Sequence, residues 1–269
     1  MNNLYKTKHE LWLKILFASF AIDDEKIKSR LYDFSQISFR HLKWISEKIL
    51  REGKDYNYDR DMMLYKRENV FEILKALKED IINTQKIYED TELFSRIKSD
   101  EKYLLEFLDE LLSDESNNQP VYAFNMQNRF ENLDIESQMS LRMFLFEESY
   151  KEYELILVYA YMQARTNSIK QYDVFQDLVD ESYFHLKSFG NMMAQMGILA
   201  LPRELHELSY KVDDLQKFII DGIKEEEAAK EMCIELSSSI KDEKLSKFFD
   251  FINNQENYHI ELMKRLLDE

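Results

Sequence analysis

The chain has 269 residues, a formal net charge of −16 and 45% hydrophobic residues, with only four glycines and two prolines. This charge disfavours nucleic acids and anionic membrane surfaces as partners, because phosphate binding needs clustered Lys and Arg. A single cysteine, Cys233, excludes an internal disulfide and any Cys-x-x-Cys metal site.

Apolar residues recur at i, i+3, i+4 and i+7 along nearly the whole chain, which predicts helices and no β-sheet. In chain order, the predicted helices cover about residues 5–21, 24–52, 62–88, 91–113, 137–165, 169–197, 204–238 and 242–268. The polar segment 113–127, which contains Pro120, is the predicted linker. Short connections between helices of this length favour antiparallel neighbours. The expected fold is therefore all-α, with two tandem antiparallel four-helix bundles.

The longest apolar stretch near the N-terminus, Leu11 to Ile22, is interrupted by Lys14. It is too short to span a membrane and lacks the cleavage site of a signal peptide. We therefore expect a core helix at this position, no membrane partner and a cytoplasmic protein.

The chain contains an internal repeat. Residues 37–46 and 181–190 share Ser-x-x-His-Leu-Lys, with His41 and His185 lying 144 residues apart. At the same offset upstream, Glu10-Leu11-x-Leu13 matches Glu154-Leu155-x-Leu157. Each copy thus carries a Glu and a His separated by 31 residues.

The ends of the two copies also match. Residues 97–112 align with residues 252–267, so that Glu101 meets Glu256 and Leu104 meets His259. These matches predict one bundle in residues 1–115, a linker in 116–136 and a second bundle in 137–269.

The C-terminal motif Glu256-x-x-His259 places a carboxylate and an imidazole on one face of a helix. Such motifs supply ligands in di-iron and di-manganese bundles, where the other helices add further carboxylates. A chain so rich in Glu produces this spacing by chance as well. Buried Glu and His side chains can also simply hydrogen-bond one another in a helical core, which is the structural alternative.

The second copy resembles the rubrerythrin-like branch of the ferritin-like superfamily. The resemblance rests on Glu154 with Tyr161 seven residues later, on His185, on the acidic segment 224–232 and on the segment 241–263, which carries Glu-x-x-His near its end. It covers residues 137–269 well and residues 5–113 weakly. It implies ferritin-like bundles and a metal-centred oxidoreductase or an iron-handling protein.

Carried over residue by residue, the resemblance implies metal ligands in all four helices of the second copy. The implied ligands are Glu154, His185, Glu225 or Glu226, Glu256 and His259. Ser182 stands where the family has a Glu three residues before the helix B histidine, so the site would hold one or two ions of iron or manganese. The first copy, with Leu104 in place of a histidine, is expected to keep the bundle and bind no metal.

These features lead to two hypotheses of different classes. In the first, the C-terminal bundle reduces peroxide or dioxygen at its metal centre, with an external electron donor because no rubredoxin-like cysteines are present, and a homodimer is compatible with this arrangement. In the second, the protein is a non-catalytic helical scaffold or partner-binding module that kept the fold without metal.

Overall fold

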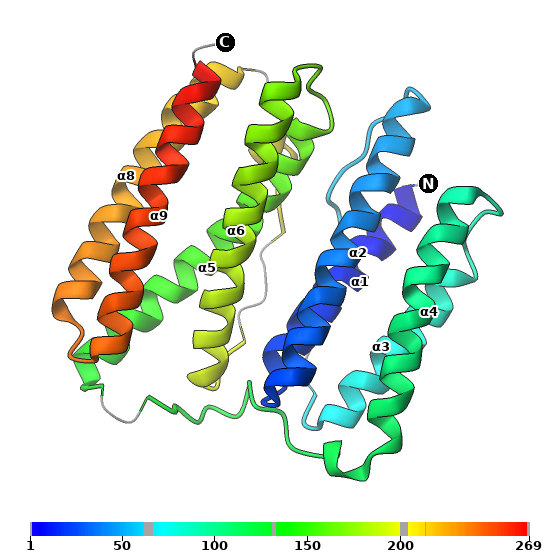
Figure 1. Ribbon diagram of the computed structural model, residues 1–269, viewed down its shortest axis with the longest axis horizontal. Helices are drawn as coiled ribbons and strands as arrows, with labels where there is room; N and C mark the ends of the chain where they lie inside the picture. Colours follow the sequence, from blue (N-terminus) through cyan, green and yellow to red (C-terminus); the bar gives the residue numbers. More distant parts are fainter. Residues whose placement is uncertain (1, 62–66, 131–132, 200–203, 213, 268–269) are drawn as a thin grey trace. The chain divides into compact units, whose positions relative to one another are not determined.

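The computed structural model describes residues 2–61, 67–130, 133–199, 204–212 and 214–267. Within these ranges the protein is helical and contains no β-strand, only an isolated bridge between Asn69 and Pro120. The all-α prediction is thereby confirmed for the described part of the chain (Figure 1).

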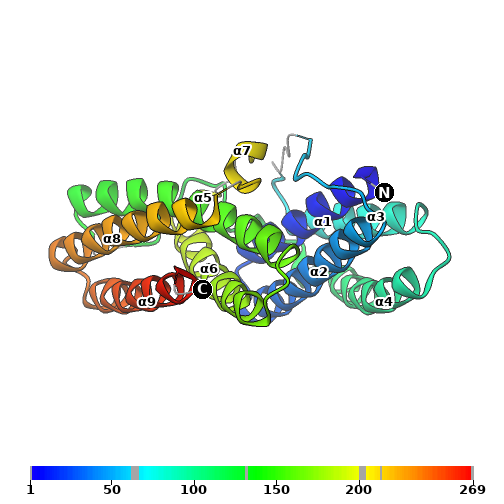
Figure 2. The same ribbon diagram turned by 90° about the horizontal axis from the view of Figure 1, so that it is seen from above.

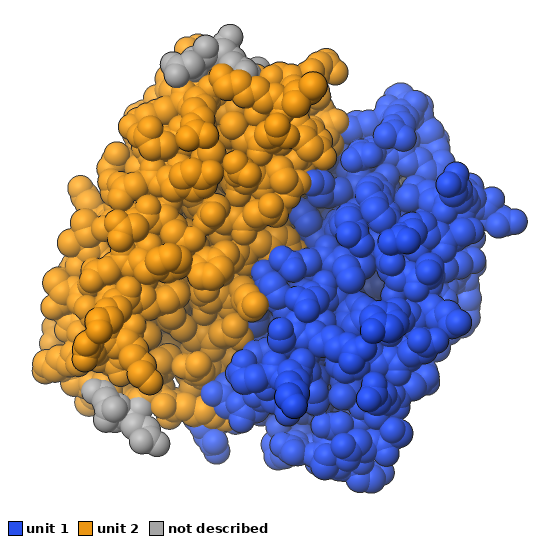
Figure 3. All heavy atoms as spheres, in the orientation of Figure 1, with its two compact units in different colours: residues 1–127, 197–199 blue, residues 128–196, 200–269 orange. Residues whose placement is uncertain are grey.

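The chain divides into two compact units (Figure 3). Unit 1 comprises residues 1–127 and 197–199, and unit 2 comprises residues 128–196 and 200–269. The division after residue 127 falls inside the segment expected to link the two repeats.

The described residues of unit 1 form four long helices and one short 3-10 turn. They are α1 (Asn2–Ala21), α2 (Glu25–Arg51), α3 (Val70–Gln85), α4 (Glu92–Ser113) and η1 (Glu115–Asn117). In the part of unit 2 that the structure describes there are also four long helices, together with one short helix. They are α5 (Ile135–Gln163), α6 (Ile169–Gln195), α7 (Glu207–Tyr210), α8 (Leu215–Ser239) and α9 (Glu243–Leu267).

The long helices have the same neighbours in both units. In unit 1, α1 packs on α2 and α3, and α4 packs on α3 and α2. In unit 2, α5 packs on α6 and α8, and α9 packs on α8 and α6. The repeat seen in the sequence is thus a repeat of packing, in which α1, α2, α3 and α4 correspond to α5, α6, α8 and α9 (Figures 1 and 2).

Local sequence explains where the helices begin and end. Asp24, Thr91, Asp134 and Ser168 each accept a backbone N–H bond from the first turn of the helix that follows. Such caps satisfy donors that the helix itself leaves unpaired. Gly53 follows α2 with φ of 70°, a backbone conformation that favours glycine.

Two predicted helices differ from the structure. The helix expected at 62–88 begins only at Val70, and the part of it at 62–66 lies outside the described residues. Residues 54–61, directly before that gap, are not helical, and Tyr56 and Tyr58 are buried against Tyr5 of α1. The helix expected at 204–238 is divided into α7 and α8, with Asp214 capping α8.

Aromatic side chains form much of each core. Trp12 packs on Phe39 in unit 1, whereas Phe144 packs on Phe189 and Phe249 in unit 2. None of the helices described here is long and apolar enough to cross a membrane.

Candidate metal centre

Five buried side chains from the four long helices of unit 2 converge in its core. They are Glu152 of α5, His185 of α6, Glu226 of α8, and Glu256 and His259 of α9. None of them is more than 4% exposed. The spacing of three residues on α9 places its two members on one helix face, as the sequence predicts.

His185 and His259 contact the carboxylates of this cluster. Nδ1 of His185 lies 2.9 Å from Glu152 and 3.6 Å from Glu256. Nδ1 of His259 lies 3.0 Å from Glu256 and 3.8 Å from Glu226. The two imidazole rings are 5.1 Å apart, centroid to centroid, and Glu256 contacts both histidines.

Two groups of three within the cluster have the proximity needed to hold an ion. One consists of Glu152, His185 and Glu256, and the other of Glu226, Glu256 and His259. The ligand atoms of each group lie within 4.8 Å of one another. Glu256 belongs to both groups, and its two carboxylate oxygens face different histidines. A carboxylate in this position can bridge two ions.

Several polar atoms of the cluster lack a hydrogen-bond partner among the described residues. They are Oε2 of Glu152 and Nε2 of His259, and Oγ of the buried Ser182, one turn before His185 on α6, also lacks a partner. A buried polar atom without a partner is costly, typically by about 1–3 kcal/mol. Carboxylate oxygens and imidazole nitrogens with free lone pairs are also the ligands that iron, manganese and zinc accept. The donor set therefore fits a transition-metal ion.

Burial and mutual repulsion shape the protonation of the carboxylates. Burial raises the pKa of Glu148, one turn before Glu152 on α5, to about 7. Burial also raises the pKa of Glu256, to about 8, and the adjacent charge of Glu226 adds to this effect, whereas its contact with His259 opposes it. The core thus retains protons on carboxyl groups that would be ionised in water.

The pKa of each of the two histidines is also raised, but by contact with carboxylates and against the effect of burial. Burial lowers the pKa of His185, but the charge and hydrogen bond of Glu152 outweigh it, and the net shift is upward. Burial likewise opposes the charge on His259, and contacts with Glu226 and Glu256 raise its pKa well above the ordinary value. The carboxylates around the two imidazoles thus favour their protonated form more than burial disfavours it.

The structure brings together four of the residues named from the sequence, namely His185, Glu226, Glu256 and His259. Of the two helix C candidates, Glu226 is buried in the cluster whereas Glu225 is exposed.

Glu154 is not brought into the cluster. It is half-buried, and the α5 carboxylate that contacts His185 is Glu152. Two residues of α-helix turn a side chain by about 200°, so these two carboxylates point to different sides of α5. The match of Glu10 with Glu154 reflects the repeat, but it marks the wrong helix face for this cluster.

The sequence did contain a signal for Glu152. At the offset of 144 residues it aligns with Lys8, a charged residue at a helical position that is otherwise surrounded by apolar neighbours. In the structure Lys8 is completely buried. Lys8 and Glu152 therefore mark the equivalent position in each repeat at which a charged side chain is buried in the core.

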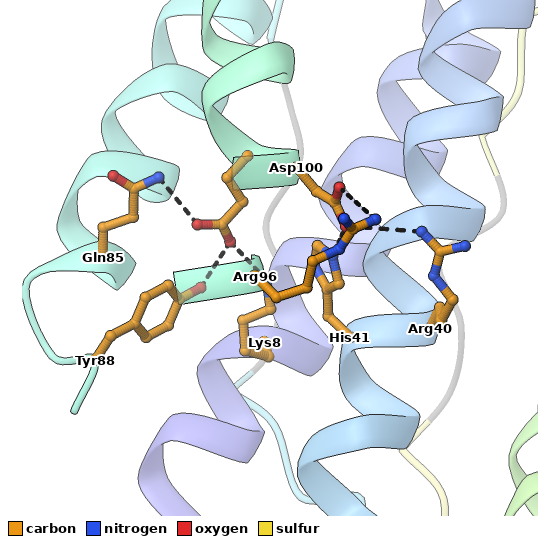
Figure 4. Close-up of polar contacts among 8 residues, drawn as sticks. Lys8, Arg40, His41, Gln85, Tyr88, Arg96 and Asp100 are labelled. Carbon is orange, nitrogen blue, oxygen red and sulfur yellow. Dashed lines mark hydrogen bonds and ion pairs between the residues drawn. The ribbon is translucent and has the colours of Figure 1, made fainter. Parts of the chain in front are cut away.

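The corresponding core of unit 1 contains an ion pair. Nζ of Lys8 lies 2.7 Å from Glu101, the counterpart of Glu256. The same carboxylate accepts hydrogen bonds from Tyr88 at 2.6 Å and from Gln85 at 3.0 Å. Figure 4 shows these donors arranged around one carboxylate. An ammonium group thus neutralises the carboxylate in unit 1.

The counterparts of His185 and His259 in unit 1 are His41 and Leu104. Nε2 of His41 lies 3.0 Å from Asp100, which Arg40 and Arg96 also contact (Figure 4). Leu104 occupies the position of His259, and a cavity of only about 10 Å³ remains beside these side chains. That space holds at most one water molecule. Burial lowers the pKa of His41 to about 4, with Lys8 adding to the effect.

Comparison of the chain with protein-family models, with curated proteins and with solved structures finds no match. The interpretation of the cluster therefore rests on its own geometry.

Proposed function

We propose that unit 2 is a ferritin-like four-helix bundle that binds one or two ions of iron or manganese through Glu152, His185, Glu226, Glu256 and His259. Unit 1 is a second bundle of the same type, in which Lys8 supplies the positive charge and no metal binds. The observation that carries the proposal is the pair of overlapping ligand groups that share Glu256.

The contrast between the two units supports this assignment. Charged groups in a protein core need a partner of opposite charge. In unit 1 a lysine side chain reaches the carboxylate, and Glu101 receives three donors. In unit 2 a glutamate, Glu152, stands at the position of that lysine, which adds negative charge and increases the demand for a cation.

The activity that this site supports best is the reduction of peroxide or dioxygen by a cytoplasmic protein. A reduced metal pair would supply electrons and polarise the O–O bond. The residues of the chain would hold the ions and adjust the charge of the site, with a proton available from Glu148, which is outside the proposed ligand set. The single cysteine is buried, so the electrons would come from an external donor.

The first experiment measures metal binding directly. Protein purified without chelator is reconstituted with ferrous or manganous ion and analysed for metal content, with Glu152→Gln compared with Glu154→Gln. We expect wild-type protein to hold at least one ion per chain, Glu152→Gln to lose most of it and Glu154→Gln to retain it. Equal retention in both variants would contradict the ligand set.

A second matched pair compares the units. His185→Gln removes a ligand from the cluster, whereas His41→Gln makes the same change at the equivalent position of unit 1. Metal loss only in His185→Gln is the expected result. Iron, manganese and zinc all far below one ion per chain in wild-type protein would favour the alternative, a helical scaffold that keeps the fold without metal.

The redox step is tested separately. Iron-loaded, anaerobically reduced protein is mixed with hydrogen peroxide, and oxidation of the iron is followed by absorbance. Oxidation of the protein-bound iron that is faster than oxidation of the same concentration of ferrous ion without protein is expected. Metal binding without reaction with peroxide or dioxygen would leave an iron-handling or structural centre in place of the oxidoreductase.

A further inference from the structure

Gln255 of α9 lies between Glu181 and His185 and makes a hydrogen bond to each. Its Nε2 donates to Oε2 of Glu181 at 2.7 Å, and its Oε1 lies 3.2 Å from Nε2 of His185. Glu181 and Gln255 are half-buried, whereas His185 is fully buried. A short chain of hydrogen bonds thus leads from the edge of the unit 2 core to the imidazole.

The chemistry of these groups fixes the direction of each hydrogen bond. An ionised carboxylate only accepts, so Glu181 binds the NH2 end of the Gln255 side chain. The carbonyl oxygen of that amide then faces His185, and it requires a donor. Nε2 of His185 therefore carries a hydrogen. The other ring nitrogen, Nδ1, points to Glu152 and Glu256.

We propose that Glu181 and Gln255 are positioning residues that make Nδ1 of His185 the atom that binds metal. This inference rests on the proposed metal centre and adds to it the orientation of one ligand. Residues outside the ligand set that hold the second nitrogen of a histidine usually change metal affinity by about 10–100-fold when they are removed.

The equivalent position in unit 1 shows the same arrangement. Asp100, which aligns with Gln255, lies 3.0 Å from Nε2 of His41. A carboxylate in this position again requires a hydrogen on Nε2. Nδ1 of His41 has no hydrogen-bond partner in the described part of the unit. Both units therefore hold the histidine of their second helix through Nε2 and direct Nδ1 to the core.

A competing geometry uses the same residues differently. Glu181, His185 and His259 also have ligand atoms within 4.8 Å of one another. In that case Glu181 would itself bind the ion, and Nε2 of His185 would lose its hydrogen. The two geometries assign opposite nitrogens of His185 to the metal, so the nitrogen that binds decides between them.

The test uses zinc as a redox-inert probe of full-length protein labelled with ¹⁵N-histidine. Long-range ¹H–¹⁵N NMR spectra distinguish a metal-bound nitrogen from a protonated one, and His185→Gln assigns the signal among the five histidines. We expect zinc on Nδ1 and a slowly exchanging hydrogen on Nε2. Zinc on Nε2 would overturn the inference, and no zinc binding by wild-type protein would overturn the proposed centre and the inference with it.

Substitutions of Gln255 distinguish a role in positioning His185 from a general effect on the stability of unit 2. Gln255→Leu removes the acceptor and is expected to weaken zinc binding by about 10–100-fold. Gln255→Glu keeps an acceptor for Nε2, so it is expected to retain zinc on Nδ1 although it places two carboxylates side by side. Exchange of the exposed Glu261 for Gln on the same helix is the control. Wild-type zinc affinity in Gln255→Leu, or equal losses in the Leu and Glu variants, would overturn the positioning role.

Discussion

Substitution of Lys8 by Met tests the assignment of unit 1 as a bundle stabilised by an internal cation. Lys8 is fully buried, and Glu101 is only 4% exposed. Methionine has a side chain of similar length, so the substitution removes the charge while it keeps most of the packing. It leaves Glu101 in the core with only its hydrogen bonds from Tyr88 and Gln85.

The magnitude follows from the geometry of the pair. At 2.7 Å, and with an effective dielectric constant of about 20, two unit charges attract by roughly 6 kcal/mol. Desolvation of both groups cancels part of this attraction. Removal of one partner from a buried ion pair typically costs about 3–5 kcal/mol, because the other charge remains uncompensated. We expect Lys8→Met to lower the free energy of unfolding of unit 1 by an amount in this range.

Tryptophan fluorescence makes the measurement specific to unit 1. Both tryptophans of the chain, Trp12 and Trp44, lie in that unit, so urea unfolding followed by fluorescence reports on it alone. Lys6→Met is a matched control on the same helix, because Lys6 lies 2.6 Å from the exposed Asp61. An exposed ion pair contributes at most about 1 kcal/mol.

A double-mutant cycle completes the test. Glu101→Gln and the combined Lys8→Met, Glu101→Gln variant remove the second charge, and the double variant should be more stable than the sum of the single effects predicts. Strict additivity, or a Lys8→Met effect no larger than that of Lys6→Met, would refute the internal-cation explanation.

Two further predictions follow. Burial lowers the pKa of His9 to about 3 and that of His41 to about 4, so as pH falls from about 6.5 to 4 the unfolded chain binds protons that native unit 1 does not. Its stability should then fall by about 1.4 kcal/mol per pH unit for each histidine, as measured by urea unfolding with tryptophan fluorescence, and a flat profile would contradict this prediction. His259→Ala should abolish metal binding by unit 2, whereas Leu104→Ala should leave metal content intact and cost unit 1 about 2–5 kcal/mol as a core truncation. Metal loss in Leu104→Ala would mean that the alignment of the two repeats misplaces the site.

Local sequence signals were sufficient to predict the long helices and the internal repeat. Apolar periodicity and the scarcity of glycine and proline predict long helices because these signals act within a few turns of chain. The segment 54–61 lies outside the predicted helices and is not helical in the structure. The burial of Tyr56 and Tyr58 against α1 is a tertiary contact that helical periodicity does not predict.

The sequence also indicated most of the cluster. The i, i+3 spacing placed Glu256 and His259 on one face of α9, and the repeat identified His185. It could not choose between Glu225 and Glu226, because the two differ only by a rotation of about 100° around the helix. The match with Glu10 and the resemblance selected Glu154, although Glu152 faces the core.

What the sequence by itself determined is the all-α class, the two-fold repeat and the residue types available for a metal site. Only the tertiary structure decided which face of each helix is buried and which carboxylate meets which imidazole. It also showed that Lys8 reaches Glu101 across 93 positions of the chain. The physical reason is that helical periodicity is a short-range property, whereas compensation of a buried charge depends on helices that are distant in sequence.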